Sequence, residues 1–108
     1  MLETPNFVLP TPQGGAAELT QEQYRCLTEV GGLSPRQRSA ITTAAQILSH
    51  LSEGMPVSFP HILELVYGKA GTRPTSIDLQ ARDALLKAGL IRKHGGGWTT
   101  RYSLPAPR

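Results

Sequence analysis

The side chains with the clearest chemical potential in this sequence are cations, and they gather in its C-terminal part. The 108-residue chain has a formal net charge of +3 and a sequence pI near 9.4. Residues 1–64 hold three basic and six acidic side chains, whereas residues 65–108 hold eight basic and two acidic ones. A basic half on a small domain suits a polyanion, most often nucleic acid. The alternative is a solvated basic face without a partner, and charge alone favours neither.

Side chains suited to metal binding or catalysis do not fall into a familiar pattern. His61 and Glu64 stand three residues apart on one predicted helix and could in principle bind a metal. The remaining ligand-type side chains are too distant in sequence to complete a three-ligand set: His50, His94 and Cys26. No paired acids, nucleophile motif or phosphate-binding Gly-Lys-Ser/Thr loop occurs. We therefore expect no enzyme activity, no metal and no cofactor.

Length and composition limit the number of domains and the cellular compartment that we expect. A chain of 108 residues with 39% apolar content suits one domain with a modest core. The single cysteine excludes an internal disulfide. The segment 1–5 lacks the basic region and apolar core of a secretory signal, and no apolar run reaches the roughly 18 residues of a membrane span. We expect a cytoplasmic protein that does not associate with membranes.

Proline, glycine and capping residues set the N-terminal elements. Residues 1–18 are rich in proline and glycine, which predicts a flexible or extended arm. A capping box at Thr20–Gln23 begins a short helix within 19–33, which Gly31 and Gly32 end. A second box at Ser34–Gln37 begins a longer helix, predicted over 35–52.

The C-terminal elements alternate between helices and short strands. Residues 57–59 are expected to form one bridge to a sheet, and Pro60 begins a short helix that ends at Gly68. A loop over 69–74 leads to a helix over 75–88, with an apolar stripe that includes Ile77, Ala81 and Leu85. Two strands, predicted over 90–93 and 98–104, flank a triple-glycine turn. Residues 105–108 are a tail.

The stretch Ala81–Leu104, with the sequence ARDALLKAGLIRKHGGGWTTRYSL, is similar to one part of bacterial winged helix-turn-helix regulators. It resembles the end of their recognition helix, the helix exit and the wing. The resemblance implies a mostly α fold with a small β-hairpin wing over 34–104. It also implies sequence-specific binding of double-stranded DNA by a dimeric transcriptional regulator. Helix 75–88 would enter the major groove, hairpin 91–104 would contact the backbone or minor groove, and the N-terminal segments are candidates for dimerisation.

Under this resemblance, polar and basic residues at the helix start and on the hairpin become candidate DNA contacts. They are Arg73, Thr75, Ser76, Gln80, Arg82, Arg92, Lys93, His94 and Arg101. Gln80 could read adenine, Arg82 could read guanine, and the hairpin cations would neutralise phosphates. Each has an alternative role. Thr75 could be a plain N-cap, Arg82 could pair with Asp78, and the hairpin cations could serve solubility.

Three apolar residues leave a second function open. Trp98 could stack on a sugar or base, but an aromatic strand residue more often covers core, so we expect it to be buried. Leu79 and Leu86 lie opposite the apolar stripe and either widen the core or face a partner. Together these residues would anchor a protein-interaction module, an adapter or inhibitor that uses the same surface on a protein partner.

Overall fold

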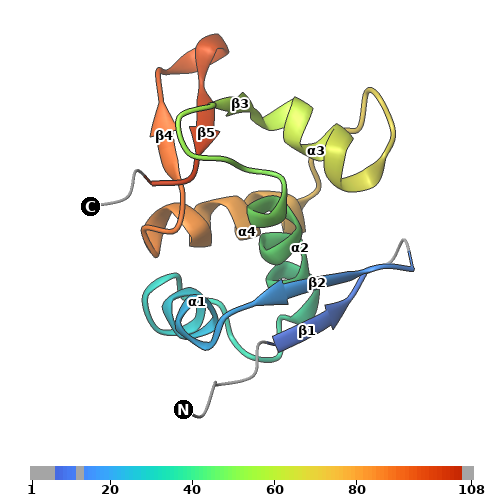
Figure 1. Cartoon of the computed structure of the whole chain (residues 1–108), viewed down its shortest axis with the longest axis vertical. Helices are drawn as coiled ribbons and strands as arrows, with labels where there is room; N and C mark the ends of the chain where they lie inside the picture. Colours follow the sequence, from blue (N-terminus) through green and yellow to red (C-terminus); the bar gives the residue numbers. More distant parts are fainter. Residues whose placement is uncertain (1–6, 12–13, 106–108) are drawn as a thin grey trace.

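The computed structural model describes residues 7–11 and 14–105, which form helices and two small antiparallel sheets in a mixed α/β arrangement (Figure 1). The helices are α1 (Gln21–Arg25), its π-helical continuation η1 (Cys26–Val30), α2 (Arg38–Ser49), α3 (Phe59–Tyr67) and α4 (Ser76–Lys87). The strands are β1 (Phe7–Pro10), β2 (Ala16–Leu19), β3 (Val57–Ser58), β4 (Arg92–His94) and β5 (Arg101–Ser103), with a 3-10 turn η2 (Gly97–Thr99) before the last. The remaining parts of the predicted arm and tail lie outside the described residues.

Helix α2 forms the centre of the core, because it is apolar or small on most of its surface. Ile41 and Ile47 are fully buried, and Ala44 and Ala45 leave room for α4 to pack closely against it. Figure 1 shows α2 in the middle of the molecule, with the β1–β2 hairpin on one side and α3 with the second sheet on the other. Burial of this helix therefore fixes the position of α4.

The start of α2 differs from the sequence prediction. The Ser34–Gln37 box was expected to cap a helix over 35–52, but α2 begins at Arg38 with Gln37 as its N-cap. The side-chain oxygen of Gln37 accepts a hydrogen bond from the Ser34 backbone N–H at 2.7 Å. Gln37 N donates to the Ser34 backbone carbonyl oxygen at 2.8 Å rather than to the Ser34 hydroxyl, so half of the box closes a separate turn ahead of the helix, and α2 ends at Ser49.

The predicted N-terminal arm is wrong over its described residues, which form a β-hairpin instead. Strands β1 and β2 pair antiparallel, with Phe7 opposite Leu19 and Pro10 opposite Ala16. Ala17 and Leu19 are buried and contribute to the core beside α2. The proline and glycine content suggested an arm, whereas alternate residues of β2, Ala17 and Leu19, are buried as in a strand that covers a core.

The N-terminal helix follows its predicted capping box and then packs into the core. Thr20 N donates to Gln23 Oε1 at 2.9 Å, and Gln23 N donates to Thr20 Oγ1 at 3.0 Å. Leu27 is fully buried. At Gly31, a Cβ atom would lie 2.7 Å from the Leu27 carbonyl oxygen and 2.8 Å from the Ala84 carbonyl oxygen. Only glycine therefore permits this close approach between the end of η1 and helix α4.

The second sheet has the strand order β3-β5-β4, so the predicted bridge at residues 57–59 is a real strand. Val57 lies opposite Tyr102, and Lys93 lies opposite the same residue from the other side. Tyr102 is buried, and its ring meets that of Phe59 edge-on at a centroid distance of 6.0 Å. These contacts fasten the β4–β5 hairpin to the start of α3.

Substitution of Gly31 by alanine tests the close contact with α4. We expect Gly31→Ala to lower the free energy of unfolding by about 1–3 kcal/mol, because backbone atoms of two elements must separate. Urea denaturation followed by circular dichroism measures the change. Gly96→Ala is the matched control: Gly96 has φ −159° and open space around it, so its change should stay within about 0.5 kcal/mol. Equal effects of the two substitutions would show that the Gly31 contact carries no energy.

Candidate nucleic-acid interface

A groove lies between α4 and the β4–β5 hairpin, and several predicted contact residues line it. We call it the hairpin groove. Its volume is about 740 Å³, and its lining includes Arg82 from α4, Lys93 from β4 and Arg101 from β5. Trp98 and Asp83 also line it. Three cations from three elements therefore border one concave surface.

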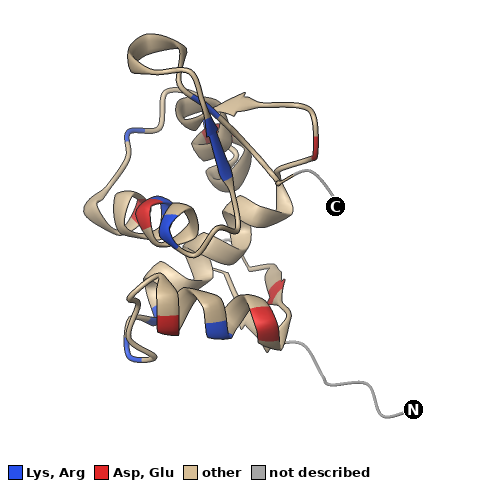
Figure 2. Ribbon diagram, turned by 90° about the vertical axis from the view of Figure 1, so that its left-hand side faces the viewer, with Lys and Arg blue, Asp and Glu red and all other residues tan. Residues whose placement is uncertain are grey.

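The β4–β5 hairpin carries three of the predicted cations. Arg92, Lys93 and Arg101 are exposed, and Figure 2 shows basic positions on the strands of this hairpin. Successive strand residues point to opposite faces, so Arg92 and Lys93 leave the sheet on different sides. Of these two neighbours, Lys93 lines the hairpin groove. Arg92 is exposed but does not line the groove.

His94 has a structural partner inside the hairpin. Its Nε2 and the hydroxyl of Ser103 share a hydrogen bond of 2.7 Å, and Ser103 is buried. The imidazole thus ties β4 to β5. Among the predicted hairpin contacts, His94 is the one whose side chain is half-buried and engaged within the sheet.

Arg82 is held by a neighbour that the sequence interpretation did not name. Its Nη2 and Nε donate to Asp83 Oδ1 at 2.9 and 3.1 Å. The guanidinium carbon also lies 5.2 Å from the centroid of the Phe59 ring. The alternative pairing with Asp78 is wrong, because Asp78 is fully buried and makes other contacts. A surface ion pair contributes about 0–1 kcal/mol, so a phosphate or base could replace Asp83 at little cost.

The start of α4 is fixed by a buried carboxylate. Asp78 accepts hydrogen bonds from Thr75 N at 2.8 Å, from Thr75 Oγ1 at 3.1 Å and from the Tyr67 hydroxyl. The Asp78 backbone N–H in turn donates to Thr75 Oγ1, which completes a capping box. The N-cap role predicted as the alternative for Thr75 is thus confirmed. Burial and the bond to Asp78 raise the pKa of Tyr67 from 10.0 to about 12.

The outer face of α4 carries the remaining helix candidates. Ser76 and Gln80 are exposed, and Gln80 Oε1 accepts a 3.4 Å hydrogen bond from Gln37 Nε2. The predicted apolar stripe is buried at Ala81 and Leu85, but its first residue is not: Ile77 is 39% exposed, and Asp78 occupies a core position instead. Leu79 is 36% exposed. Hydrophobic periodicity could not indicate that a polar residue, Asp78, occupies a core position.

Leu86 is partly buried against the core, so it widens the apolar contact of α4. Trp98 is the opposite case, since its side chain is fully exposed at 103% relative accessibility. The prediction of a core position for Trp98 is therefore wrong. The second strand begins at Arg101 rather than at residue 98, and the residues before it form η2 instead.

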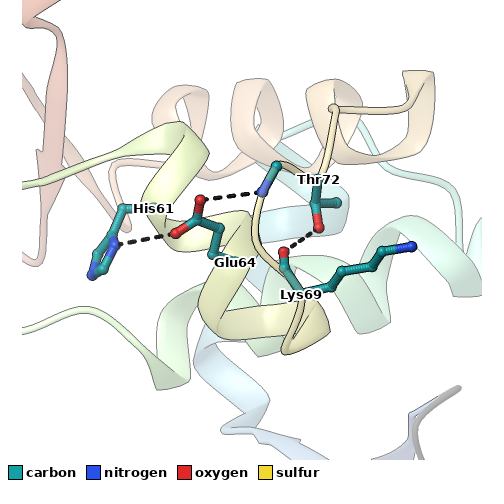
Figure 3. Close-up of polar contacts among 5 residues, drawn as sticks. His61, Glu64, Lys69 and Thr72 are labelled. Carbon is teal, nitrogen blue, oxygen red and sulfur yellow. Dashed lines mark hydrogen bonds and ion pairs between the residues drawn. The ribbon is translucent and has the colours of Figure 1, made fainter.

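The loop before α4 is held against α3 by a hydrogen bond to Glu64 (Figure 3). Glu64 accepts a hydrogen bond from the Gly71 backbone N–H at 3.3 Å and lies 3.7 Å from His61 Nδ1. Thr72 Oγ1 donates to the Lys69 carbonyl oxygen at 2.6 Å. Arg73 follows these contacts and is exposed. The cation predicted at the approach to α4 is thus carried by a loop with defined contacts.

Residues 7–11 and 14–105 also bear on two other kinds of site, metal centres and membrane spans. His61 and Glu64 contact each other, but no set of three metal-ligating side chains comes together in this part of the chain. None of the helices described there is long and apolar enough to cross a membrane.

A second concavity was missed by sequence reasoning because it depends on the N-terminal hairpin. It has a volume of about 860 Å³ and lies between β1, the start of α2 and the start of α4. Its lining is largely apolar and includes Phe7, Val8, Tyr24 and Ile77. Phe7 stacks on Tyr24 at a centroid distance of 4.3 Å. No cluster of cations accompanies this second concavity: Arg38 is the only basic residue in its lining.

The raised pKa of Tyr67 predicts how stability depends on pH. The folded state holds the phenolic proton more tightly than the unfolded chain, so this stabilisation is complete below pH 10 and is lost as the pH rises towards about 12. Tyr67→Phe removes that dependence. Urea midpoints at about pH 9 and pH 11 should fall less in the variant than in the wild type. Equal losses in both proteins would show that the hydroxyl does not couple to folding.

Comparison with family models, with curated proteins and with solved structures returned no match for this chain. The function of the hairpin groove therefore has to follow from the chemistry of its own residues.

Proposed function

We propose that this chain is a winged helix-turn-helix domain that binds double-stranded DNA sequence-specifically. Helix α4 enters the major groove, and the β4–β5 hairpin contacts the backbone or the adjacent minor groove. The biological role we propose is that of a cytoplasmic transcriptional regulator that needs no cofactor and catalyses no reaction.

The observation that carries this proposal is the shared lining of the hairpin groove by Arg82, Lys93 and Arg101. A helix and two strands bring these cations to one concave surface. Phosphates neutralised by such side chains supply most of the affinity in non-specific DNA binding. Asp83 is the acidic residue in the same lining, and it already pairs with Arg82. The net charge of the groove therefore favours an anion.

The shape of the surface also supports the proposal. The major groove is roughly 12 Å wide and admits one α-helix with its side chains. Helix α4 keeps Ser76, Gln80 and Lys87 exposed while its opposite face is buried against α2. The strand order β3-β5-β4 holds a hairpin beside this helix. A duplex that receives α4 would meet the hairpin cations at its backbone.

The proposal gives the candidate residues three roles. Arg82 and Gln80 would read bases, after exchange of their present partners. Phosphate contacts would come from the exposed cations of the loop and hairpin, which are Arg73, Arg92, Lys93 and Arg101. Thr75 and His94 position the elements, because their side chains are engaged within the fold. Ser76 is exposed in the first turn of α4 and would also contact a phosphate.

A homodimer on a two-fold site is part of the proposal, since one module of this size makes few base contacts. The N-terminal elements supply candidate contacts. Val8 on β1 is 60% exposed, and Val30 at the end of η1 is 51% exposed. Most other apolar side chains of these elements are packed in the core, so a dimer would have to use exposed ones such as Val8 and Val30.

An interaction with a protein partner is the second candidate function. Leu79 and Trp98, two of the anchors expected for an adapter, are both exposed, and each is large and apolar. Leu86 does not join them, because it packs against the core. Absence of DNA binding even at low salt would favour this second function.

The salt dependence of DNA binding tests the proposed role of the groove. Binding to a labelled duplex, followed by fluorescence anisotropy, should weaken steeply between about 50 and 200 mM salt. The double variant Lys93→Ala with Arg101→Ala should lower the slope of log K against log salt by about two units. Arg25→Ala is the control: Arg25 is an exposed cation on α1, away from the hairpin. An unchanged slope in the double variant would contradict the proposal.

Neutralisation of Asp83 should strengthen DNA binding, in contrast to the loss of a cation. Asp83→Asn removes a negative charge from the groove lining and frees the Arg82 guanidinium. We expect the affinity for duplex DNA to rise roughly fivefold, which corresponds to about 1 kcal/mol. Glu22→Gln on α1 provides the same charge change at a remote exposed site. Weaker binding by Asp83→Asn would count against a phosphate beside Arg82.

A further inference from the structure

Trp98 is exposed in a way that the fold itself does not explain. Its side chain has 103% relative accessibility, the highest among the exposed large apolar residues of the described chain. It stands on η2, in the connection between β4 and β5. An aromatic ring normally contributes a large apolar area to a core or an interface. Within this chain Trp98 contributes to neither, so the ring is available to a partner.

The connection that carries Trp98 is held by its own hydrogen bonds. Thr99 Oγ1 donates to the Gly96 carbonyl oxygen at 3.0 Å, and Thr100 Oγ1 donates to the Gly97 carbonyl oxygen at 2.9 Å. Gly95 and Gly97 have φ values of 73° and 60°, which side-chain-bearing residues rarely adopt. The backbone around the ring is therefore fixed in a turn that presents the indole outward.

The surroundings of Trp98 indicate the chemistry of its partner. It shares the lining of the hairpin groove with Arg82, Lys93 and Arg101. A purely apolar protein pocket would have to desolvate these cations without compensation. Nucleic acid offers both complements at once, because its phosphates neutralise the cations and its bases offer flat faces for stacking.

Resting on the proposed DNA binding, we propose that Trp98 stacks on a base of the bound nucleic acid as a wedge at the tip of the hairpin. An apolar side chain can enter a continuous duplex only by separating two stacked base steps. Where the stack is already interrupted, that unstacking cost is absent. The domain therefore prefers a duplex with a one-nucleotide gap to the same duplex without it.

Trp98 is the only tryptophan of the chain, so its own fluorescence reports the contact. Titration of the wild-type protein with a continuous duplex and with a gapped duplex should quench the emission. The gapped duplex should bind about tenfold more tightly. Trp98→Ala should lose this preference while it keeps the salt slope of the wild type. Trp98→Phe should restore much of the preference, because a phenyl ring still stacks.

Met55→Ala is a matched control, since Met55 is also exposed, at 68%, and does not line the hairpin groove. It should leave both affinities unchanged. If DNA binds with a steep salt dependence but the emission does not change, or Trp98→Ala keeps the preference for the gap, the stacking role is overturned and the proposed function stands. If neither duplex binds at low salt, both proposals fail and Trp98 becomes an anchor for a protein partner.

Discussion

The arrangement of this molecule depends on one buried carboxylate. Asp78 binds the backbone and hydroxyl of Thr75 and the hydroxyl of Tyr67, so it joins the cap of α4 to the end of α3. A buried carboxylate without such partners would be strongly unfavourable. Its satisfaction thus selects one geometry for the α3–α4 connection. The direction in which α4 leaves that connection decides where Arg82 stands relative to the hairpin.

The hairpin groove is basic, but it includes one acidic side chain. Asp83 neutralises part of Arg82 in the free protein and orients the guanidinium over Phe59. An exchange of this acid for a phosphate would replace one ion pair with another, so the net gain in affinity is modest. Discrimination between sequences would then depend on the base contacts of α4 more than on the total charge.

Local signals in the sequence predicted the parts of the fold that local physics controls. The capping boxes at Thr20 and Thr75, the helix that ends at Gly68 and the strand contact at Val57 are all present. The errors concern tertiary contacts. Strands β1 and β2 pair where α2 packs against them, and Asp78 is buried where the Tyr67 hydroxyl binds it. Neither condition is visible in a window of neighbouring residues.

The candidate site shows the same division. Charge counting pointed to the half of the chain that forms the hairpin groove, whereas the partners of Arg82 and His94 required coordinates. Trp98 was misjudged because alternation along a strand was extended into residues that leave the sheet as a 3-10 turn. Three consecutive glycines before it were the available signal that regular pairing would stop there.

The backbone contact of Gly31 with Ala84 has a consequence for any assembly of this chain. It joins the N-terminal segment directly to α4, without an intervening linker. Two copies associated through their N-terminal elements would consequently hold their α4 helices at one fixed separation and angle. Such a pair would tolerate almost no insertion or deletion between the two half-sites of its target.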